Sequence, residues 1–298
     1  MTDNKNDNIP AVTAERDPRD ALYVPRFAAR RAHPRITPPS FGMDLVQPLL
    51  DDAVDFLREA TVRQQVGEMR DGRAKGLHPW IKALEWHLRV RGSTLILPAP
   101  PEALVVARDM HTLKLIDDVW KSDALRAEAR RRLFKEGDPA IWEMRATGVY
   151  RFGGIQSEWT ALVTATGPDV LVPEFDVEIQ VKTRKEGPAA AKVERLLEVV
   201  EAAAGQLRGD RPGMILLVVP EVTDWTSWGL VTEPTSFNQR LLGKLADPKF
   251  RAVAGVVMAG AAVPTGSVGV TSLSNTAWFI ESPTTAFPLP DQFPIFTA

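Results

Sequence analysis

The spacing of apolar residues gives the first part of the chain a helical character. Between Asp44 and about Gly137, apolar residues recur at steps of three and four, as in Leu45, Leu49, Leu50, Val54, Leu57 and Val62. This is the period of an amphipathic helix. Further helices are expected over residues 80–90, 102–115 and 122–135. The pattern therefore predicts a helical N-terminal region over residues 41–137.

After Pro139 the pattern changes to short strands alternating with helices. A helix is expected over 140–146, with strand-like runs at 149–152 and 159–164 and an apolar strand at 170–172. Later segments are a helix at 189–207, a strand at 214–219, a helix at 237–245 and a strand at 252–259. The continuous apolar runs among them are typical of strands buried on both faces. The order strand, helix, strand predicts an α/β fold with at least one parallel crossover.

The clearest strand is the run from Asp176 to Arg184, in which polar and apolar residues alternate. Alternation predicts a half-buried strand with one polar face exposed to solvent, and residues two apart on that face lie about 6–7 Å from each other. The polar face would carry Asp176, Glu178, Gln180, Lys182 and Arg184. Because residues 173–175 form only a short connection to the strand at 170–172, the two strands should be neighbours, and Asp169 should face Gln180.

Composition narrows the chemistry that this face can perform. The chain has no cysteine and four histidines, which excludes disulfide scaffolds, cysteine-ligated zinc and thiol catalysis. A metal site would therefore use oxygen ligands, which suit Mg²⁺ or Mn²⁺. Asp169 and Gln180 supply such oxygens beside the ammonium of Lys182, which could orient or deprotonate a nucleophile and stabilise developing charge.

These residues resemble a known motif. Glu143 on a helix, Gly167-Pro168-Asp169-Val170-Leu171 and Val177-Glu178-Ile179-Gln180-Val181-Lys182 are similar to the PD-(D/E)xK nuclease superfamily, with a matching pattern from about 140 to 260. The resemblance implies a restriction-endonuclease-like core over 138–265, in which a central mixed β-sheet is flanked by helices. It also implies that Asp169, Gln180 and the carbonyl of Val181 bind Mg²⁺ (or Mn²⁺), that Lys182 is the catalytic lysine, and that Glu143 is the helix acid.

Gln180 stands where this superfamily usually has an acid. The missing charge should weaken metal binding, which depends on the number of carboxylates. The triplet is similar to the Q-x-K of Mrr-like restriction enzymes. Two alternatives stay open: the E-x-Q triplet Glu178-Ile179-Gln180 in place of Gln180 and Lys182, and Glu158 in place of Glu143.

Charge is nearly balanced but unevenly placed. Lys and Arg number 36 and Asp and Glu 38, for a net charge of -2, which excludes a broadly cationic nucleic-acid coat. Basic residues gather within a basic, proline-rich arm at 1–40 that we expect to be flexible, at 130–135, and after the motif. Arg184, Lys185 and Lys192 in the last group are expected to bind nucleic acid as a phosphate-facing rim. Residues 266–298 are expected to form a strand and a proline-rich strap.

The hypothesis is a metal-dependent nuclease that hydrolyses phosphodiesters, with DNA as the expected partner. A homodimer would suit an enzyme that cuts both strands. The alternative is a catalytically inactive nuclease-fold module that binds nucleic acid or a protein. No apolar run approaches the ~20 residues of a membrane helix, and the polar first residues lack the charged and apolar regions of a secretory signal, so a cytoplasmic protein is expected. If Asp169, Gln180 and Lys182 lay on opposite faces of the sheet, the enzyme hypothesis would fail.

Overall fold

The computed structural model describes residues 33–36, 43–72, 78–92, 99–183, 193–219, 237–267 and 270–296. All of these belong to one compact unit, His33–Ala298. Arg184, Lys185 and Lys192, and most of the expected arm, lie outside the described residues.

The first part of this unit is helical, as the apolar spacing predicts. Between a 3-10 turn at Met43–Leu45 and the sheet, its helices are α2 (Val46–Leu57), α3 (Glu59–Arg70), α4 (Ile81–Val90), α5 (Pro101–Lys114), α6 (Asp117–Lys121) and α7 (Asp123–Glu136). They pack around one apolar core, in which Leu50, Leu57, Leu84 and Met110 are fully buried.

Helix α8 (Asp138–Phe152) joins this core to the sheet. It follows Gly137, whose φ of 65° favours glycine, and it has a proline in its first turn. The expectation of a strand at 149–152 is wrong. Val149 and Tyr150 continue the apolar stripe of Trp142 and Ala146 at helical steps, and all four pack into the core beside the sheet. The strand expected at 159–164 is also wrong, because a 3-10 turn, Thr160–Leu162, occupies it.

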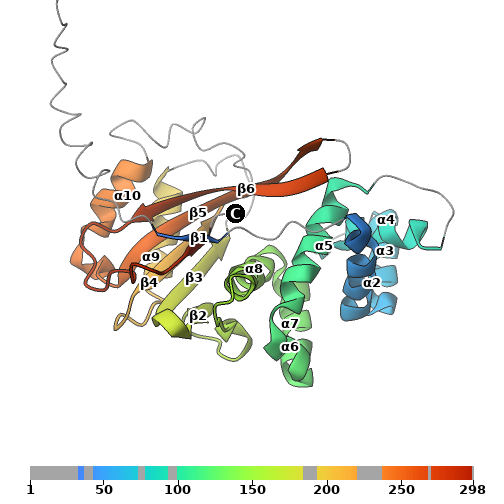
Figure 1. Cartoon of the computed structure of the whole chain (residues 1–298), viewed down its shortest axis with the longest axis horizontal. Coiled ribbons are helices and arrows are strands. Elements are labelled where there is room, and N and C mark those ends of the chain that lie inside the picture. The colour runs from blue at the N-terminus through green and yellow to red at the C-terminus, as the bar shows by residue number, and fades with distance from the viewer. Residues whose placement is uncertain are drawn as a thin grey trace, which may run out of the picture. The chain divides into compact units, whose positions relative to one another are not determined.

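The sheet has five strands in the order β2-β3-β4-β5-β6 (Figure 1). Their bounds are β2 (Val170–Val172), β3 (Val177–Thr183), β4 (Gly213–Val218), β5 (Val253–Ser267) and β6 (Val270–Glu281). Strands β3, β4 and β5 are parallel to one another, whereas β2 and β6 are antiparallel to their neighbours. The prediction of an α/β fold with a mixed sheet flanked by helices is confirmed.

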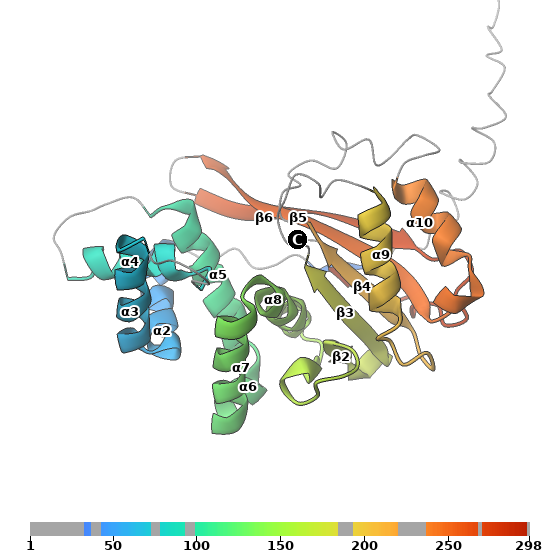
Figure 2. The ribbon, with the colours of Figure 1, turned by 180° about the vertical axis from the view of Figure 1, so that it is seen from behind.

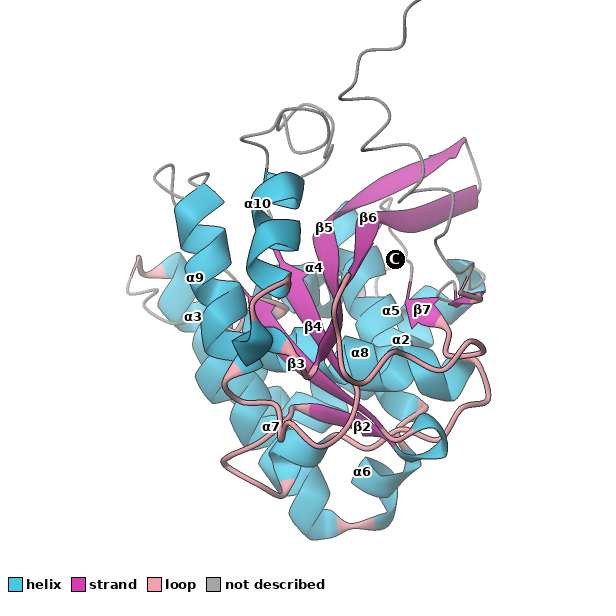
Figure 3. Cartoon of the chain, turned by 90° about the vertical axis from the view of Figure 1, so that its left-hand side faces the viewer, coloured by secondary structure: helices cyan, strands magenta, loops and turns pink. Residues whose placement is uncertain are grey.

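Helices cover both faces of this sheet, as Figure 3 shows. Helix α8 lies on one face, where its apolar side chains meet Ile179, Val181 and Leu216. The crossover helices α9 (Val193–Ala204) and α10 (Phe237–Leu245) lie on the other face and pack on Ile215 and Leu217. Strand β4 is therefore buried on both faces, which explains its continuous apolar sequence.

Strands β5 and β6 run on past the rest of the sheet as a two-stranded ribbon (Figures 1 and 2). Pairing of β4 with β5 ends at Val218 and Ala259, but β5 and β6 stay paired as far as Ser267 and Val270. The boundary expected between residues 265 and 266 thus falls inside β5. A 3-10 turn, Pro248–Phe250, leads into this strand.

A two-stranded parallel sheet joins the start of the described unit to its end. Strand β1 (Arg35–Ile36) pairs with β7 (Ile295–Phe296). The carbonyl of Pro34 accepts a hydrogen bond of 2.8 Å from the Ile295 N–H, and the buried Ile36 packs into the core beside α8. Residues 33–36 of the arm expected to be flexible are therefore held by this pairing and by the burial of Ile36. Across the described ranges, none of the helices combines the length and apolar character needed to cross a bilayer.

Candidate active site

The candidate site begins at the hairpin formed by β2 and β3. The 3-10 turn Pro173–Phe175 connects the two strands, and Asp176 completes the reversal with a left-handed φ of 53°. Asp169 directly precedes β2, and its N–H donates to the Ile179 carbonyl at 3.1 Å. Because β2 is short, β3 continues past Asp169 with one edge open toward it.

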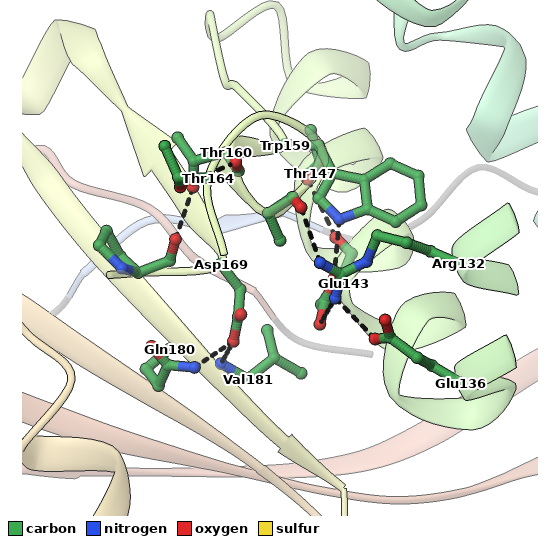
Figure 4. Close-up of polar contacts among 12 residues, drawn as sticks. Arg132, Glu136, Glu143, Thr147, Trp159, Thr160, Thr164, Asp169, Gln180 and Val181 are labelled. Atoms are coloured by element: carbon green, nitrogen blue, oxygen red, sulfur yellow. Dashed lines mark hydrogen bonds and ion pairs between the residues drawn. The ribbon is translucent and has the colours of Figure 1, made fainter. Parts of the chain in front are cut away.

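The Asp169 carboxylate lies against this open edge of β3. Its Oδ2 atom accepts a hydrogen bond from the Val181 N–H at 2.8 Å and another from the Gln180 side-chain amide (Figure 4). Asp169 thus faces Gln180, as the hairpin predicts. The carboxylate takes the position on β3 that a further residue of β2 would otherwise fill.

Lys182 lies on the same face of β3 as Gln180, because alternate residues of a strand point the same way. The Lys182 side chain is partly exposed. Burial raises the pKa of Asp169, and the positive charge of Lys182 offsets part of that rise. Asp169, Gln180 and Lys182 therefore share one corner of the sheet. The arrangement on opposite faces, which would exclude an enzyme, does not occur.

The oxygen atoms at this corner are of the types that bind hard cations. The Val181 N–H points to the β2 edge, and the carbonyl of the same residue points to that edge as well. The Gln180 side chain is 1 % exposed, and its Oε1 atom has no hydrogen-bond partner among the described residues. A buried acceptor without a donor is costly, so a cation or donor at this point would be favoured. Carboxylate, amide and carbonyl oxygens are ligands that Mg²⁺ and Mn²⁺ accept.

The number of negative charges at this corner is lower than a divalent cation usually requires. Within the described ranges, no three acidic or histidine side chains are grouped so that they could hold a metal ion. In the part of the chain that the structure describes, Asp169 is the one carboxylate hydrogen-bonded to Gln180 and Val181. A cation would thus meet one formal negative charge, which predicts weak affinity.

Some neighbouring groups raise the pKa of Asp169 and others lower it. Burial raises the pKa of this carboxyl, and the negative charge of Glu136 raises it further. The Val181 N–H and the positive charges of Lys182 and Arg132 lower the pKa. Burial dominates, so the pKa of Asp169 is above its ordinary value.

Glu143, the expected helix acid, lies on α8 behind Asp169. Its side chain is buried and accepts hydrogen bonds of 2.9 Å from Arg132 to both carboxylate oxygens, and one of 2.9 Å from the Trp159 indole N–H. Burial, and then the charge of Asp169, raise the pKa of Glu143 to about 8. The alternative acid, Glu158, is exposed and pairs through its backbone with Leu171. Of these two acids, Glu143 is the one whose pKa responds to the charge of Asp169.

Glu178 corrects the expectation of an exposed polar face on β3. It is 1 % exposed and accepts a hydrogen bond of 3.0 Å from the Arg208 N–H. The guanidinium groups of Arg208 and Arg211 lie 3.2 and 3.7 Å from it. These arginines come from the segment after α9 and cover this end of the strand. The carboxylate that the E-x-Q alternative requires is therefore engaged in ion pairs.

The sequence pattern did not indicate that Arg132 and Trp159 belong to the site. The basic run at 130–135 was the only signal, and its three arginines have different partners. Arg130 donates to the Phe56 carbonyl, Arg131 pairs with Glu128, and Arg132 reaches Glu143. Neighbouring positions on a helix point in different directions, so the run itself does not mark the one that meets the site.

Comparison with known proteins adds no identification. No protein-family model, no curated protein and no solved structure matches the chain. The resemblance to the PD-(D/E)xK superfamily therefore stays a prediction that rests on the motif.

Proposed function

We propose that the chain is a metal-dependent nuclease of the PD-(D/E)xK type that hydrolyses phosphodiester bonds in nucleic acid, with DNA as the substrate. The observation that supports this most is the meeting of the Asp169 carboxylate with the Gln180 amide and the Val181 backbone, with Lys182 next on the same face. The residues lie at the end of parallel strands in a mixed α/β sheet, a position where such folds carry ligand sites.

Each residue would have a distinct task. Asp169, Gln180 and the Val181 carbonyl would hold Mg²⁺ or Mn²⁺. A half-turn of the Gln180 amide exchanges its Nε2 for its Oε1, which places two oxygen donors side by side. When bound, the cation lowers the pKa of a coordinated water and neutralises charge on the phosphate.

Lys182 would work on the phosphodiester itself. Its ammonium is partly exposed beside Asp169, so it can hold a phosphate oxygen, orient the attacking water and stabilise charge as it develops. Arg184, Lys185 and Lys192 follow this strand in sequence and would bind the nucleic-acid backbone.

The first prediction concerns these two charged residues. Asp169→Asn and Lys182→Ala should each lower divalent-dependent cleavage of plasmid DNA by roughly a hundredfold or more, because one removes a metal ligand and the other a charge that the transition state uses. Both side chains are partly exposed at the end of the sheet, so unfolding by heat should stay cooperative in both variants.

A matched pair of controls comes from the surface ion pair of Asp117 and Lys121, whose side chains are 59 % and 73 % exposed. Asp117→Asn and Lys121→Ala make the same chemical changes there and should leave cleavage unaltered. Cleavage at the parental rate in Asp169→Asn or Lys182→Ala would mean that these residues do not form the active site.

The second candidate is a binding module on the same fold without catalysis. The observation that favours it is the amide at Gln180, which leaves a single carboxylate at the corner. This module would bind DNA with an affinity that falls steeply as salt rises, would show no divalent-dependent turnover, and would change little in Lys182→Ala.

A further inference from the structure

The five-stranded sheet has two outer strands, β2 and β6, and the outer edge of β2 is closed. The Glu158 N–H donates to the Leu171 carbonyl at 2.8 Å, and the Leu171 N–H donates back at 3.0 Å. Further along, the Ala161 N–H donates to the Asp169 carbonyl at 3.2 Å. The segment before β2 thus takes up the backbone groups that a further strand would need, and this side of the sheet offers no edge to a partner.

Strand β6 forms the opposite side of the sheet and is much longer. It has 12 residues and pairs with β5 on one side. Among the strands that the structure describes, none pairs with its outer side, and Figure 3 shows β6 at the far end of the sheet from β2. In an antiparallel pair the N–H and C=O groups of alternate residues point away from the partner. Strand β6 therefore presents a row of backbone donors and acceptors along its outer side.

The usual protections of an edge strand occur on β5 but not on β6. Proteins protect edges with charged residues, prolines or bulges. The part of β5 that runs past β4 has Pro264, and the pairing is irregular between Ala259 and Ala262. Residues 252–280 include no Lys, Arg, Asp or Glu, although 25 % of the whole chain is charged. Strand β6 therefore has neither charge nor proline before Glu281, its last residue.

The lack of charge on β6 indicates which partner suits it. Nucleic acid is bound through cations that neutralise phosphates, and a charged peptide requires the opposite charge. An uncharged strand is complementary to its own copy, because no like charges face each other when the two are paired. Antiparallel pairing of a strand with itself also obeys a two-fold axis, which is the commonest symmetry of homo-oligomers.

We infer that β6 is a dimerisation edge, at which two copies of the chain pair their β6 strands antiparallel about a two-fold axis perpendicular to the sheet. The two sheets then join into one, and each β6 gains hydrogen bonds along the side that no described strand occupies. The inference does not depend on the proposed nuclease activity, since it rests on the edge of the sheet alone.

The test places lysines in β6 of the full chain. Ser274 and Thr276 lie two apart in this strand, so Ser274→Lys combined with Thr276→Lys puts two positive charges on one face. The two-fold axis brings the same charges of the second copy to that face, where like charges across the pair destabilise it. The parent should be a dimer at micromolar concentrations in sedimentation velocity. The dissociation constant of the variant should be roughly tenfold higher or more.

The matched control puts the same charges on the other strand of the ribbon. Thr265→Lys combined with Ser267→Lys makes this change on β5, one strand further from the second copy. Neighbouring strands lie about 4.8 Å apart, so the two β5 strands of the dimer are separated by about 14 Å and their charges are largely screened. The control should dimerise as the parent does. A monomeric parent, which would leave the edge to a different partner, or equal dissociation constants in the two variants would overturn the inference.

Hydrogen exchange gives a second measurement on the parent and needs no variant. Amides of residues 270–280 should exchange more slowly as the protein concentration rises, because alternate N–H groups then bond to the second copy. Amides of β2, which the segment before it already covers, should exchange at the same rate at every concentration. If the lysine variant does not fold, this measurement decides, and exchange in β6 that is independent of concentration would contradict the pairing.

Discussion

Gln180 decides the charge of the candidate site. With an amide at this position, the negative charge of Asp169 is matched by the positive charge of Lys182. An acid there would set a second carboxylate directly against Asp169 in a place where Gln180 is almost fully buried. Like charges at such a distance raise the pKa of one partner and oppose folding unless a cation lies between them. Glutamine at this position thus stabilises the metal-free protein, whereas an acid would bind a metal more tightly.

This balance can be tested with Gln180→Glu. Without divalent cations the variant should unfold at a lower temperature than the parent, because two carboxylates then share the corner. With millimolar Mn²⁺ its midpoint should rise more than that of the parent, since a second carboxylate tightens binding and a ligand stabilises the state that it binds.

Thermal unfolding with and without Mn²⁺ measures both effects. Gln156→Glu, at an exposed position beside Arg151, is the control. Its unfolding midpoint should rise with Mn²⁺ by as much as that of the parent. A Mn²⁺-induced rise in Gln180→Glu no larger than in Gln156→Glu would contradict a cation at this corner.

At the scale of elements, the position of α8 depends on how closely it approaches α5. A side chain at Gly148 would collide with the Thr112 methyl group, and its Cβ would lie 2.8 Å from the Thr112 carbonyl oxygen. Because α8 also carries Glu143 and covers the sheet, the absence of a side chain at Gly148 helps to set where the acid and the sheet lie relative to the helical region.

Gly148→Ala should therefore destabilise the protein by about 1–3 kcal/mol, the usual cost of overpacking against atoms that cannot move away. Gly243→Ala is the matched substitution in α10, where the added methyl group meets nothing within 4 Å. It should stabilise by about 0.5–1 kcal/mol, because alanine restricts the unfolded chain and suits a helix. Denaturant unfolding of both variants gives the comparison, and equal effects would show that α8 can shift away from Thr112.

The elements also show which features could be predicted from sequence. Alternation over residues 176–184 predicted β3, and the short connection predicted that Asp169 faces Gln180, because both depend on residues near each other in the chain. The burial of Glu178 could not be predicted, since its partners Arg208 and Arg211 lie some 30 residues further on. Alternation shows which side chains share a face, but it does not show what covers that face.

The same distinction explains the error in α8. Val149 to Phe152 contains a β-branched and two aromatic residues, which are frequent in strands, but these residues belong to a helical stripe that began at Trp142. The partners of Glu143 on α7 and in the 157–162 segment required the folded arrangement of three elements. Arg132 could therefore not be assigned from sequence.

At the scale of the whole molecule, the described unit is closed by the pairing of β1 with β7. This contact joins residues some 260 positions apart and buries Ile36 beside α8. A chain that starts at Met43 should be less stable than one that starts at His33, because it loses the burial of Ile36, a contribution of about 1.5–3 kcal/mol, and leaves the edge of β7 without a partner.

Thermal unfolding of the two shortened chains tests this, and the one that starts at Met43 should unfold several degrees lower. Ile36→Ala in the full chain should lower the unfolding midpoint by a large part of the difference between the two shortened chains. Equal midpoints for the two shortened chains would show that this pairing contributes nothing to stability.

The hairpin of β2 and β3 has a consequence for the order of events in folding. Asp169, Gln180 and Lys182 lie within 14 residues on two strands that a three-residue turn connects. Loop-closure entropy is small for so short a separation, and hairpins form within about 1–10 μs. We therefore expect the three side chains to meet early and locally, whereas the contacts of Arg132 with Ala161 and Glu143 must wait until α7 and α8 have packed. The residues of the candidate corner are therefore neighbours before the helices that bury them are in place, and the burial that raises the pKa of Asp169 comes only with the finished fold.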